Sequence, residues 1–115
     1  DVRRAMSEAV HQAMVETINV PADDRFQIID ERPSGGLVYD AGYLGIKRTD
    51  GVVIIQITLN AGRTVELKKA FYARAVALLK ERANVRPEDV VINLVEVTKE
   101  NWSFGNGAMS YPPKD

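Results

Sequence analysis

The residues of this chain that can carry chemistry are few, and most of them are carboxylates and arginines. The sequence has no cysteine and one histidine, His11. This composition excludes thiolate catalysis and cysteine-ligated zinc, and it argues against a Ser-His-Asp triad or a His-rich metal site. His11 lies off the apolar stripe of its predicted helix, so we expect it to be solvated. An acid or base must come from carboxylates, arginines, tyrosines or an amino terminus.

Two charged residues stand where side chains can face a cleft. In the turn before a predicted strand, Asp23 suits closure of the turn after Pro21, whereas Asp24 is free for functional work. Arg63 follows Gly62 at the carboxyl end of a predicted strand and precedes a predicted helix, which is where α/β sheets bind ligands. Together with the free N–H groups of that helix, Arg63 can hold a carboxylate. The alternative is a solvated loop arginine.

Two large aromatic residues, Trp102 and Phe104, lie two positions apart in a short glycine-bearing tail (ENWSFGNGAMSY, 100–111). Such a pair indicates either the wall of a pocket or packing in a core or subunit interface. Both interpretations hold if a pocket lies at an interface. No glycine-containing stretch fits a Walker loop or a dinucleotide fingerprint, and no pattern indicates a metal site.

The spacing of apolar residues predicts the elements that position these side chains. Apolar steps of three and four indicate helices, and a β-branched run with little polarity indicates a strand buried on both faces. We expect a helix over 1–18, a strand over 25–31, a long loop or irregular hairpin over 32–45, a strand over 52–59, a helix over 64–83 and a strand over 90–97. Thr64 is the expected N-cap of the second helix.

The bulk properties fit a single domain over 1–115. Hydrophobic residues make up 45% of the 115 residues, and the formal net charge is −1. A protein that binds nucleic acid by neutralising phosphates is normally more basic, so we expect no nucleic-acid partner. The sequence has no apolar run of the roughly 18 residues that a membrane span needs, and it opens with no secretory signal. We therefore expect a cytoplasmic protein with no membrane partner.

An internal repeat suggests a missing element. Asn19-Val20 follows the first helix and precedes a proline, an aspartate and a strand, and Asn84-Val85 does the same 65 residues later. The second unit opens with a strand at Val52, so the corresponding strand of the first unit falls about thirteen residues before Asp1. A parallel pair joined by a crossover helix needs both strands. We expect the natural chain to begin upstream of Asp1.

Three stretches carry a resemblance to a known family. They are VPADDRF (20–26), NAGRT (60–64) and, as the most specific, NWSFGNG (101–107). With them, the sequence resembles the tautomerase superfamily, and within it the malonate semialdehyde decarboxylase-like branch, over nearly the whole chain. The resemblance implies two β-α-β units that form a four-stranded mixed sheet with two helices on one face, an α/β (α+β) fold. It also implies a homotrimer that needs no cofactor.

The resemblance also implies roles for individual residues. The family catalyst is an amino-terminal proline whose free amine acts as base or acid, and here it falls upstream of Asp1. Asp24 matches the carboxylate that assists it, and Arg63 matches one of two carboxylate-binding arginines. The other arginine falls on Ala61, which is a departure from the pattern. Trp102 and Phe104 match the aromatic residues that line the pocket.

These assignments favour keto–enol tautomerisation of small 2-oxo or enol carboxylic acids, because that reaction needs one base and one electrophile. The substrate would be a small carboxylate, with Asp24 and Arg63 catalytic and Arg63, Trp102 and Phe104 in contact with it. Decarboxylation or hydration of malonate semialdehyde type needs more groups, and Ala61 removes one of them. A catalytically silent oligomeric binding module is the remaining alternative.

Overall fold

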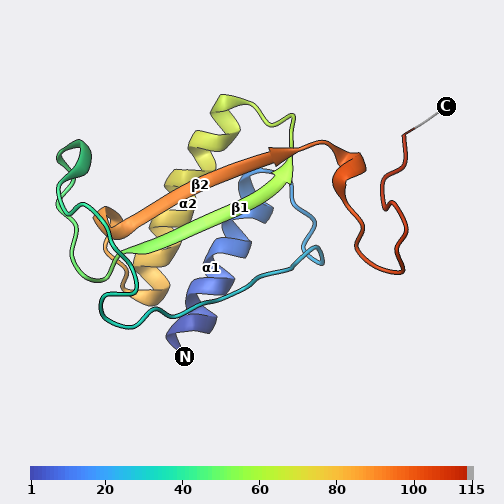
Figure 1. Ribbon diagram of the computed structural model, residues 1–115. Helices are drawn as coiled ribbons and strands as arrows, with labels where there is room; N and C mark the ends of the chain where they lie inside the picture. Colours follow the sequence, from blue (N-terminus) through green and yellow to red (C-terminus); the bar gives the residue numbers. More distant parts are fainter. Residues whose placement is uncertain (114–115) are drawn as a thin grey trace.

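The computed structural model, which describes residues 1–113, has two helices packed on one face of a parallel pair of strands (Figure 1). The elements in chain order are α1 (Val2–Thr17), the 3₁₀ turn η1 (Tyr43–Gly45), β1 (Val53–Asn60), α2 (Val65–Ala83), η2 (Pro87–Asp89), β2 (Val90–Val97) and η3 (Lys99–Asn101). Both predicted helices and the strands at 52–59 and 90–97 are confirmed to within one residue at each end. The long loop predicted over 32–45 is confirmed as irregular chain, with the short turn η1 at its end.

Each helix begins at a side-chain cap. The carboxylate of Asp1 accepts a hydrogen bond from the Arg3 backbone N–H at 3.0 Å, which explains how α1 starts at the first residue. Thr64 caps α2 by accepting from the Leu67 N–H at 3.2 Å, as its position predicts. Such a cap satisfies one of the free N–H groups of the first turn and typically stabilises a helix by ~1 kcal/mol.

The two helices also end alike, and this confirms the repeat. Asn19 and Asn84 both adopt positive φ, at 61° and 55°. The next residue of each unit donates its N–H back to the helix, from Val20 to Met14 at 3.4 Å and from Val85 to Leu79 at 3.3 Å. In both units a left-handed residue follows the last helical turn, a conformation that asparagine tolerates better than most residues. The Asn-Val pairs are therefore equivalent in structure as well as in sequence.

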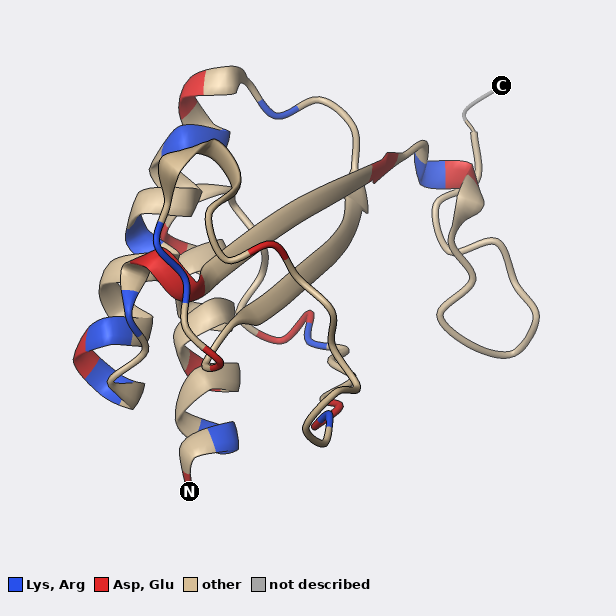
Figure 2. Cartoon of the chain, turned by 60° about the vertical axis from the view of Figure 1, so that its left-hand side comes forward, with Lys and Arg blue, Asp and Glu red and all other residues tan. Residues whose placement is uncertain are grey.

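The core lies between the helices and the sheet. Phe71, Leu78 and Leu79 of α2 are fully buried, and Ile57 and Leu59 of β1 face them from the sheet. Small residues of α1 allow the two helices to approach closely; the complete set of buried apolar residues is Ala9, Ala13, Ile18, Val20, Ile57, Leu59, Phe71, Ala75, Leu78 and Leu79. Charged residues lie mainly on the helices and loops, and the strands are almost free of them (Figure 2).

The strands run parallel, in register from Val53 opposite Val90 to Asn60 opposite Val97. Their carboxyl ends therefore meet at one edge, next to the loop that leads into α2 and the loop that leads into η3 (Figure 1). This edge is where the sequence places Arg63 and the aromatic tail. Among residues 1–113, no helix combines the length and apolar character of a membrane span.

One predicted element is absent. The segment 25–31 has no strand hydrogen bonds, so the strand expected there is wrong for the described chain, and the sheet has two strands within 1–113. A strand exists only through backbone bonds to a neighbouring strand. Here the neighbour of the segment is α1, since Gln27 Nε2 donates to the Ser7 carbonyl at 3.1 Å. The apolar side chains of the segment stay exposed, with Phe26 at 76% and Ile28 at 92%.

Candidate carboxylate-binding site

The site is built on the short connection between β1 and α2. Gly62 adopts φ of 123°, a conformation that disfavours any side chain, and this lets the chain turn sharply from strand to helix. The turn places Arg63 directly before the capped N-terminus of α2 at Thr64. An arginine and a helix N-terminus side by side both attract a carboxylate.

The Arg63 guanidinium is held in place by backbone carbonyl groups. Its Nε donates to the carbonyl oxygen of Ile18 at 3.0 Å, and its Nη1 donates to that of Asn60 at 3.0 Å. These bonds join the end of α1 to the end of β1 across 45 residues of sequence. A guanidinium has five N–H donors, so three remain for a ligand. Arg63 is half-buried and is therefore not the solvated loop arginine of the alternative interpretation.

The charge of Arg63 is not neutralised by any carboxylate that the structure describes. Glu96 lies near it, but the Glu96 carboxylate is paired with Lys68, whose Nζ lies 2.7 Å from Oε1. The hydrogen bond from Lys68 is the main cause that keeps the pKa of Glu96 below its ordinary value, and the Gly62 N–H and the charge of Arg63 add to it. Arg63 itself forms no salt bridge with any residue that the structure describes.

Trp102 and Arg63 are both hydrogen-bonded to Asn60, and Phe104 stacks on Trp102. The Trp102 indole Nε1 donates to Asn60 Oδ1 at 2.7 Å. The rings of Trp102 and Phe104 stack with their centroids 4.9 Å apart and an interplanar angle of 11°. Asn60 therefore accepts from Trp102 through its side chain and from Arg63 through its carbonyl, and it joins the aromatic tail to the arginine.

Phe26 is a third member of this aromatic group, and the sequence reasoning did not select it. Its ring stacks on Phe104 with a centroid separation of 5.4 Å and an interplanar angle of 24°. We call Phe26, Phe104 and Trp102 the aromatic wall. The available signal was that Phe26 is one of only three phenylalanines and lies two residues after Asp24. Contact across 78 positions cannot be read from one sequence.

Asp24 is close to the aromatic wall in sequence but is not bonded to Arg63. Its backbone N–H donates to the Pro21 carbonyl at 3.0 Å, which closes the turn, and its side chain is exposed. His11 braces the same turn, because its Nε2 lies 2.9 Å from the Ala22 carbonyl oxygen and must donate to it. The prediction of a solvated His11 is therefore wrong, since the side chain is half-buried.

Ala61 occupies the position where the resembled family has a second arginine. Its N–H donates to the Val97 carbonyl at 2.8 Å, which extends the ladder between the strands by one bond. The backbone is therefore ordinary there, and only the second cationic side chain is absent. The site offers one arginine to an anionic substrate where the family pattern has two.

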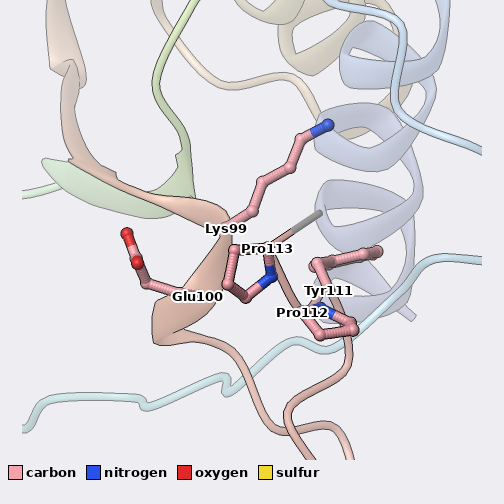
Figure 3. A pocket seen from close by; sticks show the side chains of 5 residues that line it. All are labelled: Lys99, Glu100, Tyr111, Pro112 and Pro113. Carbon is pink, nitrogen blue, oxygen red and sulfur yellow. The ribbon is translucent and has the colours of Figure 1, made fainter. Parts of the chain in front are cut away.

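Two hollows of the surface lie apart from Arg63. One, of about 260 Å³, lies in the tail between Tyr111, Pro112 and Pro113, where the side chains of Lys99 and Glu100 point away from each other (Figure 3). The other, of about 430 Å³, lies at the amino ends of the strands. No cluster of three or more metal-ligating side chains occurs within the described residues.

This geometry defines the class of protein. A half-buried arginine with free donors, a helix N-terminus and an aromatic wall lie at the carboxyl edge of the parallel sheet, and groups of these kinds can bind a small carboxylic acid. The family model described as tautomerase enzyme matches residues 24–105. Over 102 residues the chain is 44% identical to the probable tautomerase YusQ of Bacillus subtilis (strain 168), which covers 89% of this chain and 80% of YusQ. The chain belongs to the tautomerase family.

Solved structures agree with this assignment. The FG41 malonate semialdehyde decarboxylase inhibited by 3-bromopropiolate superposes with a TM-score of 0.89 at 38% identity, over 96% of this chain and 83% of that one. A fused 4-OT symmetric trimer superposes with a TM-score of 0.74 at 25% identity, over 93% of this chain and 83% of that one. Resemblance to the decarboxylase-like branch is thus confirmed by sequence and by structure.

Proposed function

We propose that the protein is a cofactor-independent keto–enol tautomerase of small 2-oxo or enol carboxylic acids. The observation that carries this is Arg63, which is fixed by two carbonyl groups, unpaired with any described carboxylate and adjacent to an aromatic wall. Such an arginine can bind the substrate carboxylate and stabilise the negative charge that develops on the neighbouring enolate oxygen. Membership of the tautomerase family supports the same reaction.

The proposed proton-transfer group is the amine of an amino-terminal proline on a strand that precedes α1. Three observations support such a strand. The repeat pairs α1 with α2, and α2 is preceded by β1. The apolar side chains of 25–31 are exposed and lack a strand partner. The aligned part of YusQ is 80% of that relative, which leaves room for additional residues. With this strand the fold would be the four-stranded sheet that the resemblance implies.

The chemistry follows from these groups. In ketonisation of an enol acid, the protonated proline amine delivers a proton to the carbon, and the enol hydroxyl loses its proton to Asp24. Proton transfer from Asp24 to the amine through solvent restores both groups, so the reaction is an isomerisation. A secondary amine in an apolar cleft ionises less readily, which brings its pKa toward neutrality and suits it to this work. Trp102 and Phe104 would exclude water around it.

Decarboxylation or hydration of malonate semialdehyde type is the second candidate. It is favoured by the 38% identity and the TM-score of 0.89 to the FG41 malonate semialdehyde decarboxylase. It is disfavoured by Ala61, because a single arginine must then both bind the carboxylate and polarise the carbonyl. A silent binding module remains as a third candidate if no proline amine is present.

Self-association as a homotrimer is part of the proposal. The sheet face opposite the helices is uncovered in the single chain, with Ile54 at 53% and Val95 at 39% exposed. A sheet normally buries its apolar face against another layer. A trimer is also the assembly named for the fused 4-OT structure.

The test is an assay of the full-length protein on phenylenolpyruvate, whose ketonisation is followed by loss of ultraviolet absorbance, and on malonate semialdehyde in parallel. We expect ketonisation well above the buffer rate, and its loss when the amino-terminal proline is replaced by alanine. Faster turnover of malonate semialdehyde would select the second candidate. Activity on neither compound would select the binding module and overturn the proposal.

A further inference from the structure

Asn60 is hydrogen-bonded both to the cation and to the aromatic wall of the candidate site. It is the last residue of β1, and it is half-buried at the edge where both strands end. Its side-chain Oδ1 accepts the Trp102 indole N–H at 2.7 Å, and its backbone oxygen accepts Arg63 Nη1 at 3.0 Å. No catalytic or binding role follows for it from the resemblance, which concerns its neighbours.

We propose that Asn60 is a positioning residue that sets Trp102 and Arg63 at a fixed separation, so that the arginine and the aromatic wall form one pocket. This inference rests on the proposed function, because the pocket it organises is the one assigned to the substrate. Asn60 does not touch the substrate in this account. It acts through the two groups that do.

The hydrogen bonds on both sides of Asn60 explain how one residue can position Trp102 relative to Arg63. The tail that carries Trp102 leaves the sheet after β2, and the Trp102 backbone N–H closes η3 by donating to the Lys99 carbonyl at 3.3 Å. The indole bond to Asn60 ties this side chain back to β1, across 42 residues of sequence. Without it, Trp102 would be held mainly by its stacking on Phe104, which is itself 38% exposed.

The backbone of Asn60 is held in place by the side chain of Arg63. The Arg63 side chain bridges the Asn60 carbonyl to the Ile18 carbonyl at the end of α1. The end of β1 is thereby held against α1 as well as against β2. A change in the Asn60 side chain frees the indole directly, and it loosens the strand end that orients the guanidinium. Replacement of the Asn60 side chain should therefore disturb the position of Trp102 more than the position of Arg63.

Trp102 provides a direct reporter, because it is the only tryptophan in the chain. Its indole N–H gives one resonance in a ¹H–¹⁵N spectrum, and hydrogen exchange at that site measures the bond to Asn60 without any substrate. The variant is Asn60→Ala in the full-length protein. Gln56→Ala is the matched control, since Gln56 lies on the same strand and loses a similar amide bond, to Asn93 Oδ1 at 3.0 Å, away from the site.

For Asn60→Ala we expect the indole resonance to move and its exchange to accelerate at least tenfold. We expect pyruvate, titrated in the same spectra, to bind about tenfold more weakly. With phenylenolpyruvate, KM should rise about tenfold and kcat should fall less. Gln56→Ala should leave all five quantities unchanged. Unaltered indole exchange or unaltered pyruvate affinity in Asn60→Ala would overturn the proposal.

Two further measurements keep the outcomes separate. If Asn60→Ala fails to fold, Trp102→Phe removes the same hydrogen bond while it keeps a stacking ring, and its pyruvate affinity should fall by a similar factor. An unchanged affinity in Trp102→Phe would count against the proposal equally. If the wild-type protein binds pyruvate but does not ketonise phenylenolpyruvate, the proposed function fails while the role of Asn60 is decided by the pyruvate affinities. If it binds no pyruvate at all, the positioning role is wrong.

Discussion

At each end of the parallel sheet, an arginine donates hydrogen bonds to backbone carbonyl groups. The arginine at the amino end is also paired with carboxylates, whereas the arginine at the carboxyl end pairs with none that the structure describes. At the amino end, Arg86 donates to Asp89 at 3.2 Å and to the Lys47 carbonyl at 3.4 Å, and it also pairs with Glu88 at 3.6 Å. Its charge is therefore neutralised within the chain. At the carboxyl end, Arg63 is fixed only by carbonyl oxygens and pairs with no described carboxylate.

We call Asp89 with its partners Thr49 and Arg86 the amino-end anchor, because these polar groups are hydrogen-bonded to one another within the chain. Asp89 is 2% exposed, and its carboxylate accepts from the Thr49 N–H at 2.7 Å and from Thr49 Oγ1 at 2.6 Å. At the same end, Arg48 Nη1 donates to the backbone carbonyl groups of Asp40, Tyr43 and Ile46. The 430 Å³ hollow at this end is lined mainly by apolar side chains, and among its polar residues Tyr39 and Arg48 are already hydrogen-bonded within the chain. The free donors at Arg63, rather than the larger of the two hollows, are the reason why we propose the carboxyl end as the functional end.

The largest effect is expected from breaking the amino-end anchor. Asp89→Ala leaves Thr49 and Arg86 without their buried partner, and removing one member of such a pair destabilises the fold by about 3 kcal/mol. The free energy of unfolding from urea titration measures this. Pyruvate affinity of the folded variant should stay within about twofold of wild type, since the site lies at the other end. A fall in affinity at temperatures where the variant is fully folded would contradict the separation of the two ends.

A smaller effect is expected from trimming the aromatic wall. Phe26→Ala removes a stacking pair worth about 1 kcal/mol, which corresponds to roughly a fivefold weaker binding of an aromatic enol acid. Tyr72→Ala is the control, because it removes a partly exposed ring on α2 that contacts Phe71 and not the wall. KM for phenylenolpyruvate should rise in the first variant only. Equal values in both would exclude Phe26 from the site.

The smallest effect is expected when the pH is lowered and the Asp89 carboxylate becomes protonated. Burial alone raises the pKa of Asp89, but hydrogen bonds from Thr49 and the charge of Arg86 outweigh it, so the net pKa lies below its ordinary value of 3.8. A carboxylate with a lowered pKa contributes stability above its unfolded pKa and loses that contribution as pH falls through its folded pKa. Wild type should therefore lose stability below about pH 4 more steeply than Asp89→Asn. Parallel urea titrations across pH 2 to 6 test this, and identical slopes would contradict it.

Local patterns predicted most of the fold. The caps at Thr64 and Asp1, the helix ends at Asn19 and Asn84 and the strands depend on residues near one another, so their periodicity is visible in the sequence. The segment 25–31 is not a strand, because its short run of apolar residues carries no information on whether a partner strand is present.

The candidate site could be predicted only in part, because some of its contacts join residues that are far apart in the sequence. Arg63, Trp102 and Phe104 could be chosen by residue type and position, and the structure places them together. The partners that organise them, Asn60 and Phe26, act through contacts between distant segments, which no local pattern records.

The central claim is that Arg63 performs the function and Arg86 holds the fold. The most direct test measures kcat/KM of the full-length protein on phenylenolpyruvate for Arg63→Ala and Arg86→Ala side by side. We predict a loss of about 100-fold, near 2.7 kcal/mol, in the first and a change within about threefold in the second. Wild-type kcat/KM in Arg63→Ala, or an equal loss in both variants, would contradict the claim.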